Sequence, residues 1–488
     1  MDFLDPQKKR EQAIRLMVGY ILIGIAIALA SFVLLLETYG FDINRKTGQV
    51  IQNGLVFVAS HPVSANLYLN GQLKGTTSTK LTIPAGHYTV VLKRDGFRSW
   101  QRSFDLQGGT VKQLVYPVLF PTKLVTSDLM QYSLTPGFVS ESPDRHWLLV
   151  QQPGAITSFD SFDLSNPTLP PLVLSLPSTL LSVSTGSDSL KLIEWSTDNR
   201  HVLVEHTFTS GTEYLVIDRQ DPTASYNVNK QFNVNPSSVA LHNKRFDQLY
   251  IYDAINKTLQ SADNSTGQLT TLINNVIAYK AYGANTILYA TTDSQTPSKN
   301  AIRLWDGKYS YLLHYYPNST NYLLDMAAYG SHTYAVVAPI GSSEVYIYKD
   351  PLAQAQQTPS ITPTPFTSLK ITQPAFVSFS SNTQFIMAQS GSSFAVYDND
   401  TGDRHLFTLK DTLPSTQQAA WMDGNRIIVV VNSKAVVLDF DGTNEQTLSA
   451  LADGTLPYFD QSYTSLYALA PSTQPTRTAL TRTLLTLK

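Results

Sequence analysis

The chain contains no cysteine among its 488 residues. That absence excludes disulfide bonds, thiol catalysis, cysteine-ligated zinc and a lipid-modified cysteine. Charged residues are also scarce, at 15 %, and the 35 Lys and Arg residues nearly balance the 37 Asp and Glu residues. Nucleic-acid binding depends on a clustered basic surface, and nothing in this balance suggests one. We therefore predict no nucleic-acid partner.

The common catalytic motifs are missing as well. There is no Gly-x-Ser-x-Gly, no P-loop, no Gly-x-Gly-x-x-Gly and no His-Glu-x-x-His. The nine His residues are scattered, and the nearest pair is His201 and His206. Their odd spacing on a predicted strand sends the two side chains to opposite faces, so we interpret both as structural. The sequence predicts no catalytic residue, no cofactor and no metal site.

Two acidic stretches, residues 398–403 and 439–442, are the candidates for a calcium loop. Calcium takes six to eight oxygen ligands, and neither stretch has the twelve-residue loop with its closing Glu. Both lie at predicted hairpin turns, where Asp, Asn and Gly are favoured for backbone reasons. We interpret them as turns. A calcium or catalytic site in a central channel is left open by the sequence.

What the chain does have, near its N-terminus, is an uncharged apolar run over residues 16–36. A bilayer core needs about 20 such residues in a helix. Lys8, Lys9, Arg10 and Arg15 precede the run, and the excess of basic residues predicts that residues 1–15 stay in the cytoplasm. The rest of the chain, beginning with a linker over residues 37–53, would then be extracytoplasmic.

Two other interpretations of this run are a buried core helix and a cleaved signal peptide. A core helix of this length would normally show a polar face, and this run has none. Ala28-Leu29-Ala30 resembles a signal-peptide cleavage site, but residues 32–36 continue the apolar run beyond it. We therefore predict an uncleaved, single-pass membrane anchor.

A small β-domain is predicted over residues 54–118. Residues 65–69 alternate apolar and polar side chains, the pattern of a strand with one buried face. Asn70-Gly71 follows at once, a strong hairpin signal because both central residues of a type I′ turn need positive φ. Residues 87–92 and 100–106 predict further strands. We expect a compact sandwich of short antiparallel strands.

This stretch resembles the PEGA domain of bacterial surface proteins. The family pattern has Ser-x-Pro-x-Gly-Ala, a polar-Gly turn, Gly-Thr-Thr, a small-Gly-His strand start and Gly-Phe, in that order. The matching positions are residues 60–65, 70–71, 75–77, 85–87 and 96–97. Val63-Ser64 stand where the family has Glu-Gly. The resemblance implies a β-sandwich in the cell envelope, used as a spacer or attachment unit, without catalytic residues.

From about residue 121 one pattern recurs: an apolar or aromatic residue, a polar turn, then an apolar strand. The clearest copies begin at Glu141, Trp195 and Trp421. Weaker copies begin at Leu241, Tyr282, Tyr329, Phe379 and Phe459. Their mean spacing is about 45 residues, close to the ~40–45 residues of a four-stranded propeller blade.

The clear copies resemble the Trp-Ser-Pro-Asp-Gly blades of TolB-like and WD40-like β-propellers. The resemblance implies a propeller over residues 121–488. Eight copies favour eight blades, with seven as the alternative. Two unrelated β-domains with similar hairpins are the other interpretation. Few strands remain after the last copy, so residues 123–125 are expected to return and complete the final blade, which removes exposed strand edges.

Two segments interrupt the repeat. Residues 351–370 are rich in Pro and Thr, and residues 164–178 carry a similar Pro-rich stretch. We expect the first to be an extended loop or a flexible surface insertion, and the second to be a comparable break.

The predicted fold is mainly β: a transmembrane helix, a PEGA-like sandwich and a propeller. The first functional hypothesis is a membrane-anchored binding or scaffold protein that presents its propeller to an envelope protein or a cell-wall glycan. The second is an extracytoplasmic propeller enzyme, a glycan lyase or hydrolase. Carboxylates clustered at the mouth of the channel would favour the enzyme. A third, a sensor signalling through residues 1–15, is disfavoured because that tail is too short to fold alone.

Overall fold

The structure is a computed structural model. It describes residues 6–38, 40–43, 50–182, 186, 188–293, 296–357, 362–472 and 477–487. The chain divides into two compact units, residues 1–123 and 124–488. We describe each unit by itself.

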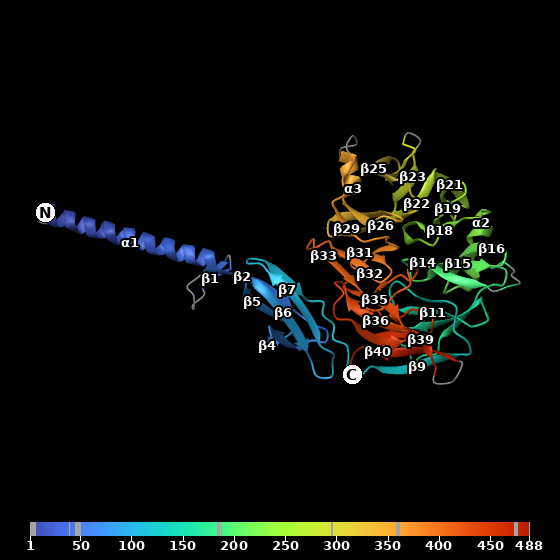
Figure 1. The fold of residues 1–488 in the computed structure, drawn as a ribbon, viewed down its shortest axis with the longest axis horizontal. Helices are drawn as coiled ribbons and strands as arrows, with labels where there is room; N and C mark the ends of the chain where they lie inside the picture. Colours follow the sequence, from blue (N-terminus) through green and yellow to red (C-terminus); the bar gives the residue numbers. More distant parts are fainter. Residues whose placement is uncertain are drawn as a thin grey trace. The chain divides into compact units, whose positions relative to one another are not determined.

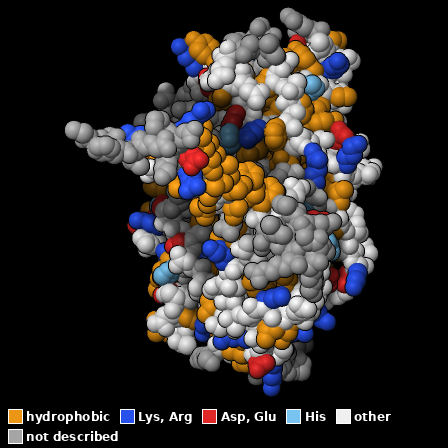
Figure 2. Space-filling model, turned by 90° about the vertical axis from the view of Figure 1, so that its left-hand side faces the viewer, with side chains coloured by type: hydrophobic (Ala, Val, Ile, Leu, Met, Phe, Trp, Pro, Cys, Tyr) orange, Lys and Arg blue, Asp and Glu red, His pale blue; other side chains and the backbone are white. Residues whose placement is uncertain are grey.

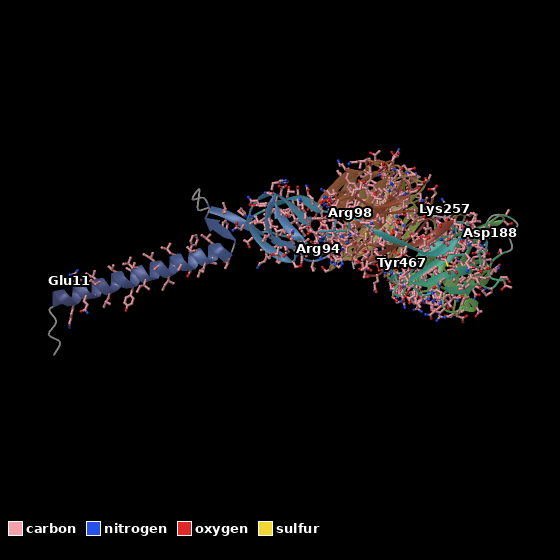
Figure 3. The ribbon with its side chains drawn as sticks, turned by 90° about the horizontal axis from the view of Figure 1, so that it is seen from below. Glu11, Arg94, Arg98, Asp188, Lys257 and Tyr467 are labelled. Carbon is pink, nitrogen blue, oxygen red and sulfur yellow. The ribbon has the colours of Figure 1, made fainter. Side chains whose placement is uncertain are left out.

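The first unit begins with one long helix, α1 (Pro6–Thr38). Its apolar stretch, Lys9–Leu36, is long and apolar enough to cross a membrane, and none of its most hydrophobic part is buried. The side chains of Ile21, Ile25 and Phe32 are about half exposed. Hydrophobic side chains gather along this helix in Figure 2 and project around it in Figure 3. The predicted helix is confirmed, and its crossing of a membrane stays a prediction.

The same unit contains a β-sandwich of two four-stranded sheets. One sheet contains β1 (Phe41–Ile43), β2 (Val50–Val58), β5 (Thr79–Pro84) and β8 (Val111–Leu114). The other has the order β4 (Gln72–Thr76), β3 (Asn66–Leu69), β6 (Gly86–Lys93) and β7 (Trp100–Leu106). Leu67, Leu92, Trp100 and other apolar side chains fill the space between them.

One feature of this sandwich differs from the prediction of antiparallel strands, because β2 and β8 are parallel. The chain leaves β7 in one sheet and enters the other sheet beside β2, so β8 runs in the same direction as β2. The predicted hairpin is confirmed: Asn70 has φ 48° and Gly71 has φ 79°, and β3 pairs with β4.

The PEGA-like residues have a clear local role. The hydroxyls of Ser60 and Thr77 are 2.8 Å apart, and the Thr77 hydroxyl also accepts the backbone N–H of Ala65. These contacts join the Ser-x-Pro segment to the Gly-Thr-Thr segment. Ser64 has φ 63°, so the position where the family carries Gly still needs a left-handed backbone.

The second unit consists of eight four-stranded antiparallel sheets in the part of the chain that the structure describes. The first sheet contains β10 (Val139–Glu141), β11 (Trp147–Gln151), β12 (Ser158–Asp163) and β13 (Leu172–Ser175). The second contains β14 (Ser189–Trp195), β15 (His201–Phe208), β16 (Gly211–Asp218) and β17 (Tyr226–Asn227). The third contains β18 (Ser238–Leu241), β19 (Gln248–Asp253), β20 (Thr258–Asp263) and β21 (Gln268–Ile273). The fourth sheet contains β22 (Val276–Tyr282), β23 (Thr286–Thr292), β24 (Lys299–Trp305) and β25 (Ser310–Pro317). The fifth contains β26 (Tyr322–Tyr329), β27 (His332–Pro339), β28 (Glu344–Lys349) and β29 (Thr367–Lys370). The sixth contains β30 (Phe376–Phe379), β31 (Phe385–Ser390), β32 (Ser393–Asp398) and β33 (Arg404–Thr408). The seventh sheet contains β34 (Ala420–Trp421), β35 (Arg426–Val431), β36 (Lys434–Asp439) and β37 (Gln446–Ala450). The eighth contains β38 (Tyr458–Phe459), β39 (Ser465–Pro471), β40 (Thr478–Leu484) and β9 (Val125–Tyr132).

These sheets form a β-propeller, in which the strands lie around a ring (Figure 1). The first strand of each sheet is the innermost, since β14 contacts β18 and β22 contacts β26. Apolar side chains of neighbouring sheets pack together, as Leu149 and Val204 do between the first two sheets. The ring closes through Leu148, which shares a cluster with Tyr467 of the last sheet.

The last sheet is completed from the beginning of the unit. Strand β9 pairs with β40 along Val125–Tyr132. The return of the chain predicted at residues 123–125 is therefore confirmed, although the strand extends further. Pairing of the two strands in one ladder closes the ring at this point.

The sequence repeat marks one particular place in each sheet. Every predicted starting residue, from Glu141 to Phe459, is the last residue of the innermost strand of its sheet. The polar turn that follows is held by a carboxylate: Asp144 Oδ1 accepts hydrogen bonds from the Ser142 hydroxyl at 2.5 Å and the His146 backbone N–H at 3.1 Å. Asp198, Asp423 and Asp460 accept backbone N–H groups in the corresponding turns.

The two Pro-rich segments are more ordered than predicted. Residues 351–357 form helix α3 (Pro351–Gln357), with Pro at its start and Ala355 buried. Residues 367–370 form β29, and residues 172–175 form β13, both outermost strands of their sheets. The expectation of a loop was wrong at these positions because Pro is tolerated at a helix start and before an edge strand. Residues 358–361 lie outside the described residues.

Candidate functional site

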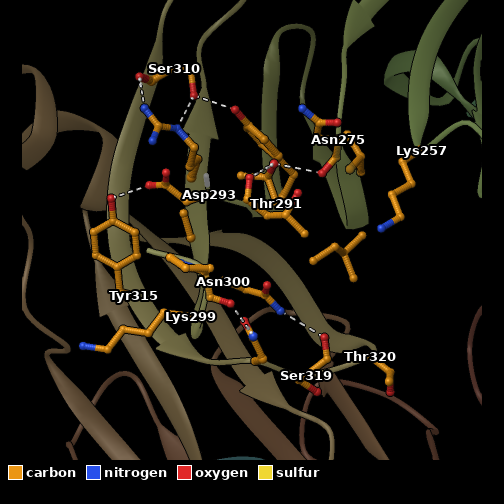
Figure 4. Close-up of a pocket in the computed structure, with 18 of the residues that line it drawn as sticks. Lys257, Asn275, Thr291, Asp293, Lys299, Asn300, Ser310, Tyr315, Ser319 and Thr320 are labelled. Carbon is orange, nitrogen blue, oxygen red and sulfur yellow. Dashed lines mark hydrogen bonds between the residues drawn. The ribbon is translucent and has the colours of Figure 1, made fainter. Parts of the chain in front are cut away.

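A large cleft of the second unit lies between the sheets β18–β21 and β22–β25. It has a volume of about 1240 Å³. We call it the polar cleft. Its lining comprises Tyr252, Ala254, Lys257, Asn275, Val276, Ile277, Tyr289, Thr291, Thr292, Asp293, Pro297, Lys299, Asn300, Ala301, Arg303, Ser310, Tyr315, Asn318, Ser319 and Thr320. Figure 4 shows most of these side chains.

The cleft opens at one edge of the sheets. Neighbouring antiparallel strands run in opposite directions. At one edge of a four-stranded sheet, the first and third strands therefore begin and the second and fourth strands end. The connections between successive sheets lie there too, so we call it the connection edge. Asn275 precedes β22, Asp293 follows β23, Lys299 begins β24 and Asn318 follows β25. The cleft therefore lies on the side of the ring where connecting segments carry functional residues.

A short connection explains why this interface is hollow. Only Asn274 and Asn275 join β21 to β22, the shortest of the eight connections between successive sheets. Residues 409–419, by contrast, join β33 to β34, and residues 228–237 join β17 to β18. A two-residue connection is too short for its side chains to cover the gap between the two sheets. At this edge, the facing sides of the sheets therefore stay open to solvent.

Below the opening, the two sheets pack as elsewhere in the ring. Tyr250, Leu259 and Ile273 of the sheet β18–β21 meet Ile287 and Tyr289 of the sheet β22–β25. The same face of β23 continues outward as Thr291, whose hydroxyl donates to the Asn275 carbonyl at 2.8 Å. The change from apolar to polar residues along one strand face marks the floor of the cleft.

Hydrogen bonds hold the polar side chains of the cleft in place (Figure 4). The Tyr315 hydroxyl donates to Asp293 Oδ2 at 2.7 Å. The Asn300 Nδ2 donates to the Ser319 carbonyl at 3.0 Å. The Asn318 Nδ2 donates to the Pro297 carbonyl at 2.8 Å. Since each bond uses one end of a side chain, the other polar atoms are positioned in advance for a ligand.

A second group of bonds surrounds Arg303. Its Nε donates to the Ser310 hydroxyl at 2.9 Å, and that hydroxyl lies 2.6 Å from the hydroxyl of Tyr289. The guanidinium is thus oriented by its neighbours rather than by a carboxylate. Lys257 and Lys299 lie on opposite sides of the close-up in Figure 4. Three basic residues accompany one carboxylate, Asp293, in the lining.

Two titratable groups respond to this environment. The hydrogen bond to Asp293, followed by burial, raises the pKa of Tyr315 above its ordinary value. Burial and the nearby Lys299 lower the pKa of His314, which lies on β25 beside the cleft. Both shifts favour the neutral forms at neutral pH. The charge of the cleft therefore comes from Lys257, Lys299, Arg303 and Asp293.

The sequence singled out His201 and His206, and the structure gives each its own partners. His201 Nδ1 lies 2.6 Å from Asp198 Oδ2, and its ring stacks on Phe246 at 3.7 Å. His206 Nδ1 lies 2.9 Å from Glu213 Oε1. In the described ranges, no group of three or more His, Asp or Glu residues is arranged to hold a metal ion.

The two acidic stretches are hairpin turns. Asp398 accepts the backbone N–H of Asp400 at 2.8 Å and the hydroxyl of Thr401 at 3.0 Å. Asp441 likewise accepts the Thr443 hydroxyl at 2.7 Å. These bonds occupy the carboxylates with their own turns, as the preference of Asp for turns predicts.

Acidic residues on the innermost strands bear on the enzyme hypothesis. Among the described residues they are Glu141, Glu194 and Asp325. Glu141 Oε1 lies 3.6 Å from Arg145 Nε, Glu194 forms an ion pair with Lys244, and Asp325 Oδ1 lies 2.8 Å from Lys280 Nζ. Each carboxylate has its own base and lies on a different sheet.

The candidate residues that the sequence did not indicate are those of the polar cleft. They come from six segments between Tyr252 and Thr320 and belong to two sheets. The available signal was the brevity of the segment between β21 and β22, because every other sheet is joined to the next by a longer one.

Comparison with known proteins bears on both units. A family model described as "PEGA domain" matches residues 53–117. This confirms the resemblance drawn from residues 60–97. No curated protein matches the chain.

Solved structures resemble part of the chain. The β-propeller domain of Myceliophteria thermophila Cps50 (Swd1) is 11 % identical, with 65 % of this chain and 97 % of that chain covered and a TM-score of 0.39. Kluyveromyces lactis Hsv2 is 9 % identical, with 64 % and 98 % covered and a TM-score of 0.40. The chain thus contains a segment that matches the PEGA domain and, in the second unit, the eight four-stranded sheets of a β-propeller.

Proposed function

We propose that this protein is a membrane-anchored binding protein that presents its propeller outside the cytoplasm to an envelope protein or a cell-wall glycan. The observation that carries the proposal is the polar cleft of about 1240 Å³ at the connection edge of the ring. Its prepositioned hydroxyl, amide and basic groups are suited to recognising a polar ligand.

In this proposal residues 1–15 form a cytoplasmic tail and residues 16–36 span the membrane. Residues 37–53 link the span to the PEGA-like sandwich over residues 54–118, which spaces the propeller of residues 121–488 from the membrane. The exposed apolar surface along α1 supports the span, since a soluble protein would bury it. The ion-paired carboxylates on the innermost strands support binding rather than the catalytic alternative.

Protease treatment of intact cells tests the topology. We expect an added protease to remove residues 54–488 from outside while a tag at the N-terminus remains protected. A chain that lacks residues 1–36 should leave the membrane fraction. Protection of the C-terminal units after permeabilisation of every outer layer would contradict the proposal.

Crosslinking of intact cells followed by mass spectrometry tests the binding role. We expect a protein or glycan adduct on peptides from the connection edge, and fewer adducts when Thr292→Trp narrows the polar cleft. Turnover of a glycan by the purified chain, retained after the same substitution, would favour the enzyme instead.

A further inference from the structure

We propose that the ligand of the polar cleft is an anionic carbohydrate, a sugar chain bearing carboxylate or phosphate groups. The inference rests on the proposed binding function and specifies its ligand. It follows from the charge of the cleft, from its hydroxyl and amide lining and from the two tyrosine rings at its walls.

The cleft carries a local excess of positive charge, although the whole chain has a formal net charge of −2. Lys257, Lys299 and Arg303 line it, with Asp293 as the one carboxylate in the lining. Elsewhere in the unit, exposed lysines such as Lys244 and Lys280 have carboxylates beside them.

Within the described ranges, none of the three cleft cations takes part in an ion pair. The single carboxylate already accepts the hydroxyl of Tyr315. A ligand with negative groups would supply the missing counter-charges, and charge-assisted hydrogen bonds are about twice as strong as neutral ones.

The polar lining fits a ligand rich in hydroxyl groups. Asn300 and Asn318 each spend an amide N–H on a backbone carbonyl, which fixes the planes of both side chains. Their carbonyl oxygens are then oriented acceptors for hydroxyl donors. Thr292 and Thr320 add hydroxyl groups that both donate and accept. A sugar hydroxyl also donates and accepts hydrogen bonds, so each hydroxyl of a sugar chain can pair with a polar group of this lining.

Two tyrosine rings are held as walls. The Tyr252 hydroxyl donates to the Val276 carbonyl at 2.9 Å, and the Tyr315 hydroxyl donates to Asp293 at 2.7 Å. Because each hydroxyl is anchored, each ring is restricted in its rotation. The electron-rich face of an aromatic ring attracts positively polarised C–H groups, which the ring face of a pyranose presents.

An acidic peptide would also satisfy the charges, but the cleft suits it less. Protein and peptide ligands gain most of their affinity from large side chains inserted into apolar pockets. Polar residues outnumber the aliphatic residues of the lining, which are Ala254, Val276, Ile277, Pro297 and Ala301. The lining therefore favours a ligand whose polar groups are spread along its length.

Isothermal titration calorimetry with the full chain in detergent micelles tests the inference. The probes are hexagalacturonate, a phosphorylated mannan hexasaccharide, uncharged cellohexaose and hexaglutamate. We expect one anionic sugar to bind at least about tenfold more tightly than cellohexaose and hexaglutamate, with an affinity that falls as salt is added. The better of the two anionic sugars identifies carboxylate or phosphate as the recognised group.

Matched variants locate the binding. The double variant Lys257→Gln with Lys299→Gln should weaken binding of the preferred sugar by about tenfold or more. Lys410→Gln with Lys434→Gln removes the same charge from exposed positions outside the cleft and should change affinity by less than about twofold. The thermal unfolding midpoints of both double variants should equal that of the unmodified chain, since all four lysines are exposed.

The inference is overturned if neither anionic sugar binds, if cellohexaose binds equally well, if hexaglutamate binds best, or if the cleft variant binds like the unmodified chain. The cell-surface experiments report separately on the proposed function. External cleavage and a crosslinked partner would stand even if every sugar failed, whereas a cytoplasmic propeller would refute both.

Discussion

Two interfaces in the same ring differ at the connection edge. Between the sheets β30–β33 and β34–β37, residues 409–419 cover the gap, with Leu413 and Ala419 buried. Between the sheets β18–β21 and β22–β25, only Asn274 and Asn275 connect the strands, and the gap is the polar cleft. The strands on either side are alike in number and direction, so the connection decides whether an interface is filled or open.

A covered interface also needs a buried polar group that binds the connection. Gln389 is fully buried, and its Nε2 donates to the carbonyls of Gly391 and Gln417 at 3.0 and 2.9 Å. Its Oε1 accepts the Ala419 N–H at 2.7 Å. A connecting segment brings backbone groups into the protein, and each must find a partner there. In the cleft, side chains of the lining bind the backbone instead: the Thr291 hydroxyl donates to the Asn275 carbonyl at 2.8 Å.

The largest effect is expected from Gln389→Ala. The substitution leaves backbone groups of Gly391, Gln417 and the buried Ala419 without their partner and creates a cavity, so the free energy of unfolding should fall by about 3–4 kcal/mol. Urea unfolding followed by tryptophan fluorescence measures it. Gln268→Ala, at an exposed position of β21, is the matched control and should cost less than about 0.5 kcal/mol. Equal costs for the two variants would mean that Gln389 does not hold the connection.

A second covered interface uses a charge instead. Glu213 on β16 accepts the backbone N–H of Ser182 at 2.8 Å and its hydroxyl at 2.6 Å, and the Asn227 amide at 2.8 Å. Burial raises the pKa of Glu213, but the hydrogen bonds from His206, Ser182 and Asn227 outweigh it and lower the pKa to about 2. The carboxylate therefore stays charged in the folded state.

This shift predicts acid sensitivity. Because the folded pKa lies below the ordinary value, Glu213 stabilises the fold above about pH 4.3, and that contribution is lost as the pH falls toward 2. Glu213→Gln should lower the free energy of unfolding at pH 7 by on the order of 2 kcal/mol and remove that part of the pH dependence. Urea unfolding at pH 7, 4 and 3 measures both. A variant as acid-sensitive as the unmodified chain would exclude this role.

Much of the fold could be predicted from the sequence because its signals are local. The turns after several innermost strands hold an Asp that binds backbone N–H groups, so Asp144 and Asp198 leave a visible pattern. Asn70-Gly71 marks a hairpin for the same reason, since few other residues accept positive φ. Helix α3 was missed because the composition of residues 351–370 as a whole concealed a short helical stretch.

The polar cleft could not be predicted in this way. Lys257 and Lys299 are far apart in the sequence, and only the packing of two sheets brings them to one opening. Each residue alone looks like an ordinary turn or edge residue. The cleft is also open because no connecting segment covers it, and the absence of such a segment produces no sequence motif. The two-residue connection at Asn274 and Asn275 is the one local sign, and it has meaning only once the sheets are known.

The smallest expected effect compares the same pair of residues, a Tyr that donates to an Asp, in the polar cleft and in a buried interface. Tyr315 donates to Asp293 in the polar cleft at 2.7 Å, and Tyr132 donates to Asp160 in a buried interface at 2.9 Å. Tyr315→Phe should lower the free energy of unfolding by only about 0.5 kcal/mol, because water can reach the carboxylate that is left. Tyr132→Phe should cost about 1.5 kcal/mol, because Asp160 is 1 % exposed and loses a donor that water does not replace. Urea unfolding of the two variants at pH 7 compares them directly. If Tyr315→Phe costs as much as Tyr132→Phe, the carboxylate in the cleft is not solvated, and the contrast between an open and a covered interface fails at the residue where it is easiest to measure.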